Sequence, residues 1–140
     1  MNPITILLAE DHPDIRTGLH ALLMGEADFE IVGEAENGLQ AVAMASKLCP
    51  DVVVMDISMP LLNGLEATRQ ILQTTSSIKI IMLSAHDEEA YIEHALALGA
   101  VGYLIKNSVT HLLPQAIRAV LQGQIVINPV EPSQQSHESD

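Results

Sequence analysis

The stretch from Asp51 to Pro60 constrains the fold more than any other part of this sequence. It contains the apolar run Val52-Val53-Val54-Met55, which ends in a single carboxylate, Asp56, and a turn signal follows at Asn63-Gly64. An apolar run without polar alternation is typical of a strand buried on both faces, as in a parallel sheet. Asp56 is therefore predicted to lie at the carboxyl end of a central strand, where open α/β sheets bind their ligands.

Strands and helices are predicted to alternate along the rest of the chain. Short apolar runs mark strands, and the segments between them carry apolar residues at helical spacing. Asn37 and Asp87 are predicted helix N-caps, and Gly99 is the predicted end of the helix that Asp87 begins. Five strands that alternate with five helices predict a doubly wound α/β fold, with a parallel sheet and helices on both faces. The predicted strands start near residues 4, 29, 52, 78 and 101.

Polar residues follow or end four of the predicted strands. Glu10 and Asp11 come after the first strand, and Asp56, Ser84 and Lys106 end later ones. Because the carboxyl ends of parallel strands lie at one edge of a sheet, these side chains are expected to converge. Three carboxylates at close quarters repel one another unless a cation bridges them or some are protonated. An all-oxygen set of this kind suits Mg2+.

Asp56 is the candidate phosphate acceptor of this site. A carboxylate can act as a nucleophile and form an acyl phosphate, and phosphoryl transfer depends mostly on positioning and charge neutralisation. Lys106 and the metal ion would neutralise charge, while the Ser84 hydroxyl would donate to a phosphoryl oxygen. The alternative roles are a cap of the following loop for Asp56 and a simple turn residue for Ser84.

The composition excludes several classes of function. The chain has 140 residues, with 18 Asp and Glu against 6 Lys and Arg, a formal net charge of −12. Nucleic-acid binding by this chain is not expected, because phosphate contacts need clustered basic side chains. No apolar run approaches the roughly 18 residues of a membrane span. The single Cys49 favours a reducing, cytoplasmic setting and is expected to be a small packing residue.

Several motifs, in order along the chain, resemble the receiver domain of two-component response regulators. They are Glu10-Asp11, Asp56 followed by Met59-Pro60 and Gly64, Ser84-Ala85, and Gly102-Tyr103-Leu104-Ile105-Lys106. The segments from Asp14 to Leu19 and from Gly99 to Lys106 are most similar to the NarL/FixJ subgroup. The resemblance extends from about Ile4 to Gln122, nearly the whole part that is predicted to fold.

The resemblance implies a CheY-like, flavodoxin-like fold with five strands in the order 2-1-3-4-5. It also implies that Asp56 accepts a phosphoryl group from a sensor histidine kinase. Glu10 and Asp11 would hold Mg2+ together with Asp56, and the backbone carbonyl of Ser58 would be a further ligand. The domain would be regulatory rather than an enzyme, with self-phosphorylation and slow autodephosphorylation expected.

The resemblance further implies a switch and an output. Ser84 and Tyr103 would be the switch pair, in which the hydroxyl moves toward the phosphate and the ring turns inward, while Lys106 would pair with the phosphoryl group. Tyr103 as a half-buried packing ring is the alternative. Phosphorylation would drive a homodimer, through the fourth helix, fifth strand and fifth helix or through the first and fifth helices.

Some residues near the site depart from the family pattern or have an open role. Asn107 replaces the Pro that often follows the lysine, which removes the usual reason for a cis peptide bond. Glu10 replaces the more frequent Asp and is expected to reach the ion through water. His12 and His86 flank the site. His86 could tune dephosphorylation, although a solvated loop histidine is an equal alternative for each.

The chain is predicted to divide into a receiver domain, residues 1–127, and a polar linker or disordered tail, residues 128–140. Members of the NarL/FixJ subgroup usually continue past such a linker into a helix-turn-helix domain. We therefore expect a transcription regulator that contacts DNA only through a domain absent from this chain. A stand-alone receiver that acts through protein–protein interaction is the alternative.

Two functions from other classes fit the sequence less well. A phosphatase with an aspartyl nucleophile, of the haloacid-dehalogenase type, normally carries a second Asp two residues after the nucleophile, and that place is Ser58 here. A flavodoxin-like nucleotide-binding module would need a Gly-rich phosphate loop after the first strand, and the chain has Glu10-Asp11 there.

Overall fold

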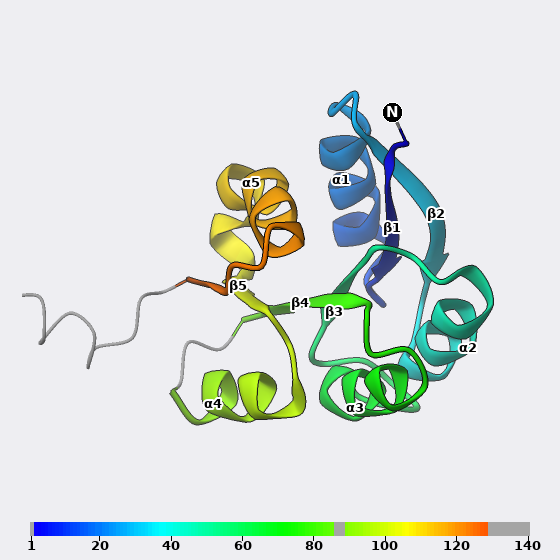
Figure 1. The fold of residues 1–140 in the computed structure, drawn as a ribbon, viewed down its shortest axis with the longest axis vertical. Helices are drawn as coiled ribbons and strands as arrows, with labels where there is room; N and C mark the ends of the chain where they lie inside the picture. Colours follow the sequence, from blue (N-terminus) through cyan, green and yellow to red (C-terminus); the bar gives the residue numbers. More distant parts are fainter. Residues whose placement is uncertain (1, 86–88, 129–140) are drawn as a thin grey trace, which may run out of the picture.

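A six-stranded parallel sheet forms the centre of the molecule, with helices on both faces (Figure 1). The computed structural model describes residues 2–85 and 89–128. The sheet order is β2-β1-β3-β4-β5-β6, and every pair of neighbouring strands is parallel. The strands are β1 (Ile4–Ala9), β2 (Phe29–Ala35), β3 (Val52–Asp56), β4 (Lys79–Ser84), β5 (Gly102–Ile105) and β6 (Val126–Asn128). The helices are α1 (Pro13–Met24), α2 (Gly38–Leu48), α3 (Gly64–Thr74), α4 (Glu89–Leu98) and α5 (Val109–Leu121), with a short 3-10 turn, η1 (Lys106–Ser108), before α5.

Alternation along the strands divides the core into two layers. Val53 and Met55 of β3 pack toward α2, α3 and α4, whereas Val52 and Val54 pack toward α1 and α5. Side chains alternate between the two faces of a strand, so an unbroken apolar run serves both layers at once. All five residues of β3, including Asp56, are buried. The central strand predicted from the sequence is confirmed.

Capping hydrogen bonds at the helix starts and a close backbone contact at Gly64 fix the loops near the carboxyl edge of the sheet. The predicted N-cap Asn37 accepts a hydrogen bond from Gln40 N, and Asn63 caps α3 in the same way. Gly64 begins α3 directly against β3, and a Cβ there would lie 2.3 Å from the carbonyl oxygen of Asp56. Only a residue without a side chain allows this approach, so Gly64 helps to fix the loop beside Asp56.

The sheet has one strand more than the sequence predicts. After Gly123 (φ +90°) the chain turns back, and Val126 N donates to Val101 O at 2.9 Å as β6 pairs with β5. The five-strand prediction missed this element because three residues carry too little periodic signal. β6 includes Asn128, the first residue assigned to the tail. The rest of that predicted tail and the predicted helix cap Asp87 lie outside the described residues.

Cys49 differs from its expected role. It is exposed rather than packed, and it follows α2 in a left-handed conformation with φ 46°. The helix ends at this residue, so the side chain leaves the apolar stripe of α2 instead of continuing it. Across residues 2–85 and 89–128, no helix combines the length and apolarity that crossing a membrane requires.

Candidate functional site

The strand order brings the acidic residues together at the carboxyl edge of the sheet. β1 and β3 are neighbours, with Ala9 paired to Met55, so Glu10 follows β1 at the level where Asp56 ends β3. Lys106 follows β5 at the same edge. One carboxylate oxygen each from Glu10, Asp11 and Asp56, together with a ring nitrogen of His12, lie within 4.8 Å of one another. The convergence predicted for the three acids and Lys106 is confirmed.

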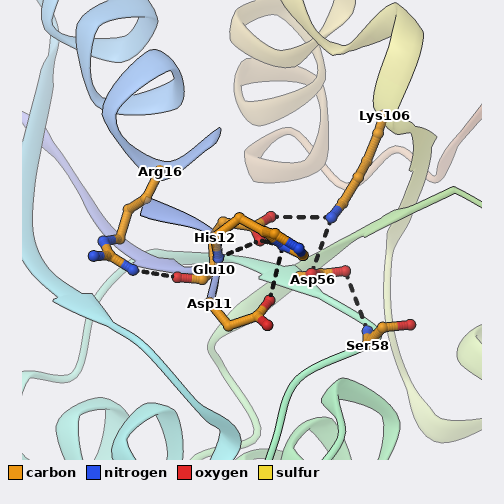
Figure 2. Close-up of polar contacts among 7 residues, drawn as sticks. All are labelled: Glu10, Asp11, His12, Arg16, Asp56, Ser58 and Lys106. Carbon is orange, nitrogen blue, oxygen red and sulfur yellow. Dashed lines mark hydrogen bonds and ion pairs between the residues drawn. The ribbon is translucent and has the colours of Figure 1, made fainter. Parts of the chain in front are cut away.

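Asp56 is held by contacts to both of its carboxylate oxygens. Its side chain is 2% exposed, and Oδ2 accepts a hydrogen bond from Lys106 Nζ at 3.0 Å. Oδ1 accepts a hydrogen bond from the backbone N–H of Ser58 at 3.1 Å. Figure 2 shows the Lys106 side chain reaching down from its turn to the carboxylates. The alternative role of Asp56 as a cap of the following loop therefore explains only the contact of Oδ1 with Ser58, and not the contact of Oδ2 with Lys106.

The surroundings of Asp56 disfavour its charge. Burial raises the pKa of Asp56 from 3.8 to about 6, and the nearby charge of Glu10 adds to this rise, although Lys106 and the Ser58 N–H oppose it. Burial acts to lower the pKa of Lys106, but its hydrogen bond and ion pair with Asp56 and the charge of Glu10 together raise it. Lys106 is therefore a permanent ammonium that offsets only part of the negative charge in the site.

Glu10 is fully buried, and its two oxygens face different residues, Lys106 and His12. Oε1 lies 3.2 Å from Lys106 Nζ, and Oε2 accepts a hydrogen bond from the backbone N–H of His12 at 3.1 Å. The ring nitrogen Nδ1 of His12 lies 3.1 Å from Glu10 Oε2 and 3.3 Å from Asp11 Oδ1. The hydrogen bond to Glu10 and the charge of Asp11 raise the pKa of His12.

Arg16 supports the acidic pair from the first turn of α1, a role that sequence reasoning missed. Its guanidinium donates a hydrogen bond to the backbone carbonyl of Glu10 at 2.6 Å (Figure 2), and its Nε lies 3.5 Å from Glu34 on β2. His20 pairs with the same Glu34 at 2.7 Å. Arg16 lies in the segment that resembles the NarL/FixJ subgroup. Its position in the sequence, six residues after Glu10, was the only indication that its side chain could reach back to the acidic pair.

The donor set fits a hard divalent cation. Within the described part of the chain, Glu10 Oε1 and Asp11 Oδ1 are buried and lack a hydrogen bond of good geometry, and of the two only Glu10 Oε1 lies near the Lys106 ammonium, at 3.2 Å. Buried carboxylate oxygens without donors are costly, and a bound cation would compensate them. Mg2+ in proteins is bound by oxygen ligands, usually one or two carboxylates together with waters and phosphate oxygens. Glu10, Asp11 and Asp56 are therefore able to hold such an ion.

The remaining predicted site residues take positions around this cluster. Ser84 is buried at the end of β4, one residue after Leu83, the partner of Asp56 in the sheet. Tyr103 is fully buried on β5 and packs in the layer toward α4, so its ring is buried more deeply than the half-buried packing ring of the alternative. His86 lies outside the described residues.

The fold agrees with solved structures of one class of protein. A two-component response regulator of the LuxR family from Aurantimonas sp. SI85-9A1 is 34% identical, with a TM-score of 0.87 and coverage of 91% of each chain. The response regulator domain of Thermotoga maritima CheB is 31% identical, with a TM-score of 0.81, and the match covers 94% of this chain and 100% of the CheB chain. Fold and acidic site together define a receiver-type α/β domain.

The sequence comparisons assign the family. The family model described as "Response regulator receiver domain" matches residues 6–118, and this chain belongs to that family. The transcriptional regulatory protein DegU of Brevibacillus brevis is 42% identical over 128 residues, which are 91% of this chain and 54% of DegU. The nitrate/nitrite response regulator protein NarL of Escherichia coli K12 is 37% identical over 126 residues, 90% of this chain and 58% of NarL. The domain is of the NarL/FixJ type, and the chain spans just over half the length of these relatives.

Proposed function

We propose that Asp56 accepts a phosphoryl group from a sensor histidine kinase in a Mg2+-dependent reaction, and that the acyl phosphate switches the conformation of the domain. The observation that carries this proposal is the buried carboxylate of Asp56 beside both the Lys106 ammonium and the buried Asp11 Oδ1, which has no hydrogen bond of good geometry among the described residues. An acceptor needs a fixed nucleophile and cations for the incoming charge. Family membership supports the same assignment.

Phosphoryl transfer to Asp56 forms one bond to phosphorus and breaks another. A carboxylate oxygen of Asp56 attacks phosphorus, the bond from phosphorus to the imidazole nitrogen of the donor breaks, and that nitrogen keeps the electron pair. Mg2+, held by Glu10, Asp11, Asp56 and the backbone carbonyl of Ser58, supplies neutralisation of the phosphoryl oxygens when bound. The Ser58 N–H, now bonded to Asp56 Oδ1, keeps the carboxylate oriented during attack.

Three further residues receive roles after the transfer. The Lys106 ammonium, 3.0 Å from Asp56 Oδ2, pairs with the new phosphoryl group, and Ser84 hydrogen-bonds it from the end of β4. Tyr103 belongs to the strand that follows, with Met82 as its partner in β4, so a shift of the β4 end reaches its ring. A switch of this kind works by biasing an existing equilibrium between two states.

The output of the switch would be transcription, with a homodimer formed on phosphorylation. This part rests on the relatives: DegU is named a transcriptional regulatory protein, and the chain covers only 54% of its length. A DNA-binding domain beyond the receiver would supply the basic surface that this chain, at a net charge of −12, does not provide. His86 would tune the lifetime of the acyl phosphate.

The test is incubation with Mg2+ and acetyl phosphate, followed by intact-mass measurement. We expect one phosphate-sized adduct, lost in Asp56→Ala and in the presence of EDTA, and retained in Asp14→Asn, which changes an exposed carboxylate of α1. No adduct at any Mg2+ concentration would overturn the proposal. Steady hydrolysis of a generic phosphate monoester that depends on Asp56 would instead favour the aspartyl phosphatase, although Ser58 stands where such an enzyme has its acid.

A further inference from the structure

The short strand β6 lies directly beside the strand that carries Tyr103. The residue pairs across β5 and β6 are Gly102 with Val126, Tyr103 with Ile127, and Leu104 with Asn128. Val126 N donates a hydrogen bond to Val101 O at 2.9 Å, and the orange segment after α5 in Figure 1 returns beside β5. Gly123, in the left-handed conformation with φ +90°, allows the chain to make this return. β6 therefore covers the edge of β5.

Ile127 closes one side of the space around the Tyr103 ring. Paired residues of neighbouring strands project from the same face of a sheet, about 4.8 Å apart. Tyr103 thus lies between Met82 of β4 and Ile127 of β6, in the layer that α4 covers. The ring is fully buried, although Ile127 itself is only half-buried. Because β5 would be the edge of the described sheet without β6, Ile127 separates the ring from solvent on that side.

Strand pairing connects this contact to the phosphoacceptor. Asp56 pairs with the residue before Ser84 on β4, and Ser84 pairs with Ile105 of β5. Tyr103 lies two residues earlier on β5, on the same face as Ile105. Buried side chains are close-packed, so the ring cannot turn outward past the edge of β5 while Ile127 is in place. A docked β6 and an outward Tyr103 ring therefore exclude each other.

β6 is suited to reversible attachment. It has three residues, and all three are half-buried. Segments with few buried apolar contacts open locally at a small fraction of the free energy of global unfolding. The five strands β1 to β5 and their helices form both layers of the core, so β6 can detach without disrupting them.

We propose that β6 is a strap that holds the Tyr103 ring inward, and that phosphorylation of Asp56 strengthens the attachment of β6 to β5. The proposal rests on the proposed function, in which an inward ring belongs to the phosphorylated state. Two events that favour the same ring position favour each other, and the coupling acts equally in both directions. A docked β6 makes phosphorylation more favourable, and phosphorylation makes β6 harder to detach. The strap thereby fixes the direction of the chain that follows Asn128 when the site is phosphorylated.

The first test measures the Tyr103 ring in the full chain. The protein has two tyrosines, so incorporation of 3-fluorotyrosine gives two fluorine signals, and Tyr91→Phe assigns them. We expect no shift of the Tyr103 signal of the wild type between H2O and D2O, because the ring is fully buried. A solvent shift that appears when β6 is weakened reports that the ring has gained access to water.

Two variants weaken β6 in different ways. Ile127→Ala removes the side chain beside the ring, and Val126→Pro removes the N–H that binds the edge of the sheet. Both should produce the solvent shift of the Tyr103 signal. Ile125→Ala is the matched control, because Ile125 is 62% exposed and precedes β6, and it should leave the signal unchanged.

The second test measures the coupling in both directions, with Mg2+ and the phosphoryl mimic BeF3−. BeF3− should slow hydrogen exchange at the Val126 N–H by about fivefold or more, the lower end of ordinary coupling between two sites. The Ile4 N–H should not respond. It is the control amide, because it donates to Asp28 O at 2.8 Å in β1, which β3 and β4 separate from β5. Ile127→Ala should weaken BeF3− binding by about the same factor, and Ile125→Ala should not.

Several results would overturn the proposal. Faster exchange at Val126 with BeF3− would mean that phosphorylation releases β6, and unchanged exchange would mean that β6 is independent of the site. A Tyr103 signal without a solvent shift in both Ile127→Ala and Val126→Pro would mean that β6 does not hold the ring. Circular dichroism should show that every variant folds.

Failure of the proposed function looks different from failure of the strap. If neither the acetyl phosphate adduct nor BeF3− binding is found in the wild type, the phosphoacceptor function is wrong, and with it the coupling to phosphorylation. The fluorine signal of Ile127→Ala needs no phosphoryl group, so it then decides by itself whether β6 holds the ring. If the adduct forms and Val126 does not respond to BeF3−, only the strap is wrong.

Discussion

Asp56 is expected to destabilise the metal-free fold, and replacing it should make the domain more stable. Burial raises the pKa of this carboxyl from 3.8 to about 6, despite the hydrogen bond from Lys106. One pKa unit corresponds to about 1.4 kcal/mol, so a rise of about two units costs the folded state at most about 3 kcal/mol when Asp56 is charged. Asp56→Asn keeps the shape of the side chain and removes that charge.

The pH dependence follows from the direction of the shift. Below pH 3.8 Asp56 is protonated in both the folded and the unfolded chain, and its contribution is then zero. Between 3.8 and about 6 the unfolded chain loses this proton first, so stability falls as the pH rises. Above about 6 the full cost is present. The advantage of Asp56→Asn should therefore grow across this window and level off above it.

The assay is urea unfolding followed by far-UV circular dichroism at pH 4 to 8, in EDTA. We expect Asp56→Asn to exceed the wild type by up to about 3 kcal/mol at pH 8 and to match it near pH 4. Asp14→Asn, at an exposed position, should stay within about 0.5 kcal/mol throughout. Mg2+ should narrow the gap by binding the folded wild type. A variant less stable than the wild type at pH 8, or a gap that does not depend on pH, would refute the reasoning.

Two other predictions concern the loop beside the site and an exposed ion pair. Gly64→Ala should destabilise the domain by about 1–3 kcal/mol and slow adduct formation, because its Cβ would lie 2.3 Å from the Asp56 carbonyl oxygen. Gly18→Ala should stabilise the domain by about 0.5–1 kcal/mol, because a Cβ at this position in α1 meets nothing within 4 Å. Urea unfolding that ranks the two variants in the opposite order would contradict this prediction. Glu66 accepts hydrogen bonds from Arg69, which lower the pKa of Glu66 from 4.5 to about 2. This pair therefore stabilises the fold above the ordinary carboxyl pKa, and that stabilisation is lost as the pH falls toward 2. A carbon-detected NMR titration should show the low pKa of Glu66, and a pKa that stays low in Arg69→Gln would count against the pairing.

The local signals in the sequence predicted most of the fold correctly. The unbroken apolar run before Asp56 required a strand covered on both faces, and the N-cap Asn37 acts as expected. The missed features depend on contacts between distant parts of the chain. β6 forms because the backbone N–H of Val126 donates a hydrogen bond to Val101 O, next to β5 at the edge of the sheet. Cys49 is exposed because α2 ends at this residue. Neither outcome leaves a periodic pattern in the residues concerned.

The sequence by itself determined which side chains stand at the ends of the strands: Glu10 and Asp11 after one apolar run, Asp56 and Lys106 after two others. Their chemistry and order were sufficient to indicate a phosphoacceptor and metal site. The tertiary structure decided how close they lie and how charged they are. The pairing of β1 with β3 brings Glu10 level with Asp56, and the depth of burial raises the pKa of Asp56. These quantities depend on the sum of many packing contacts across the sheet, whereas strand ends follow from the residues next to them in the chain.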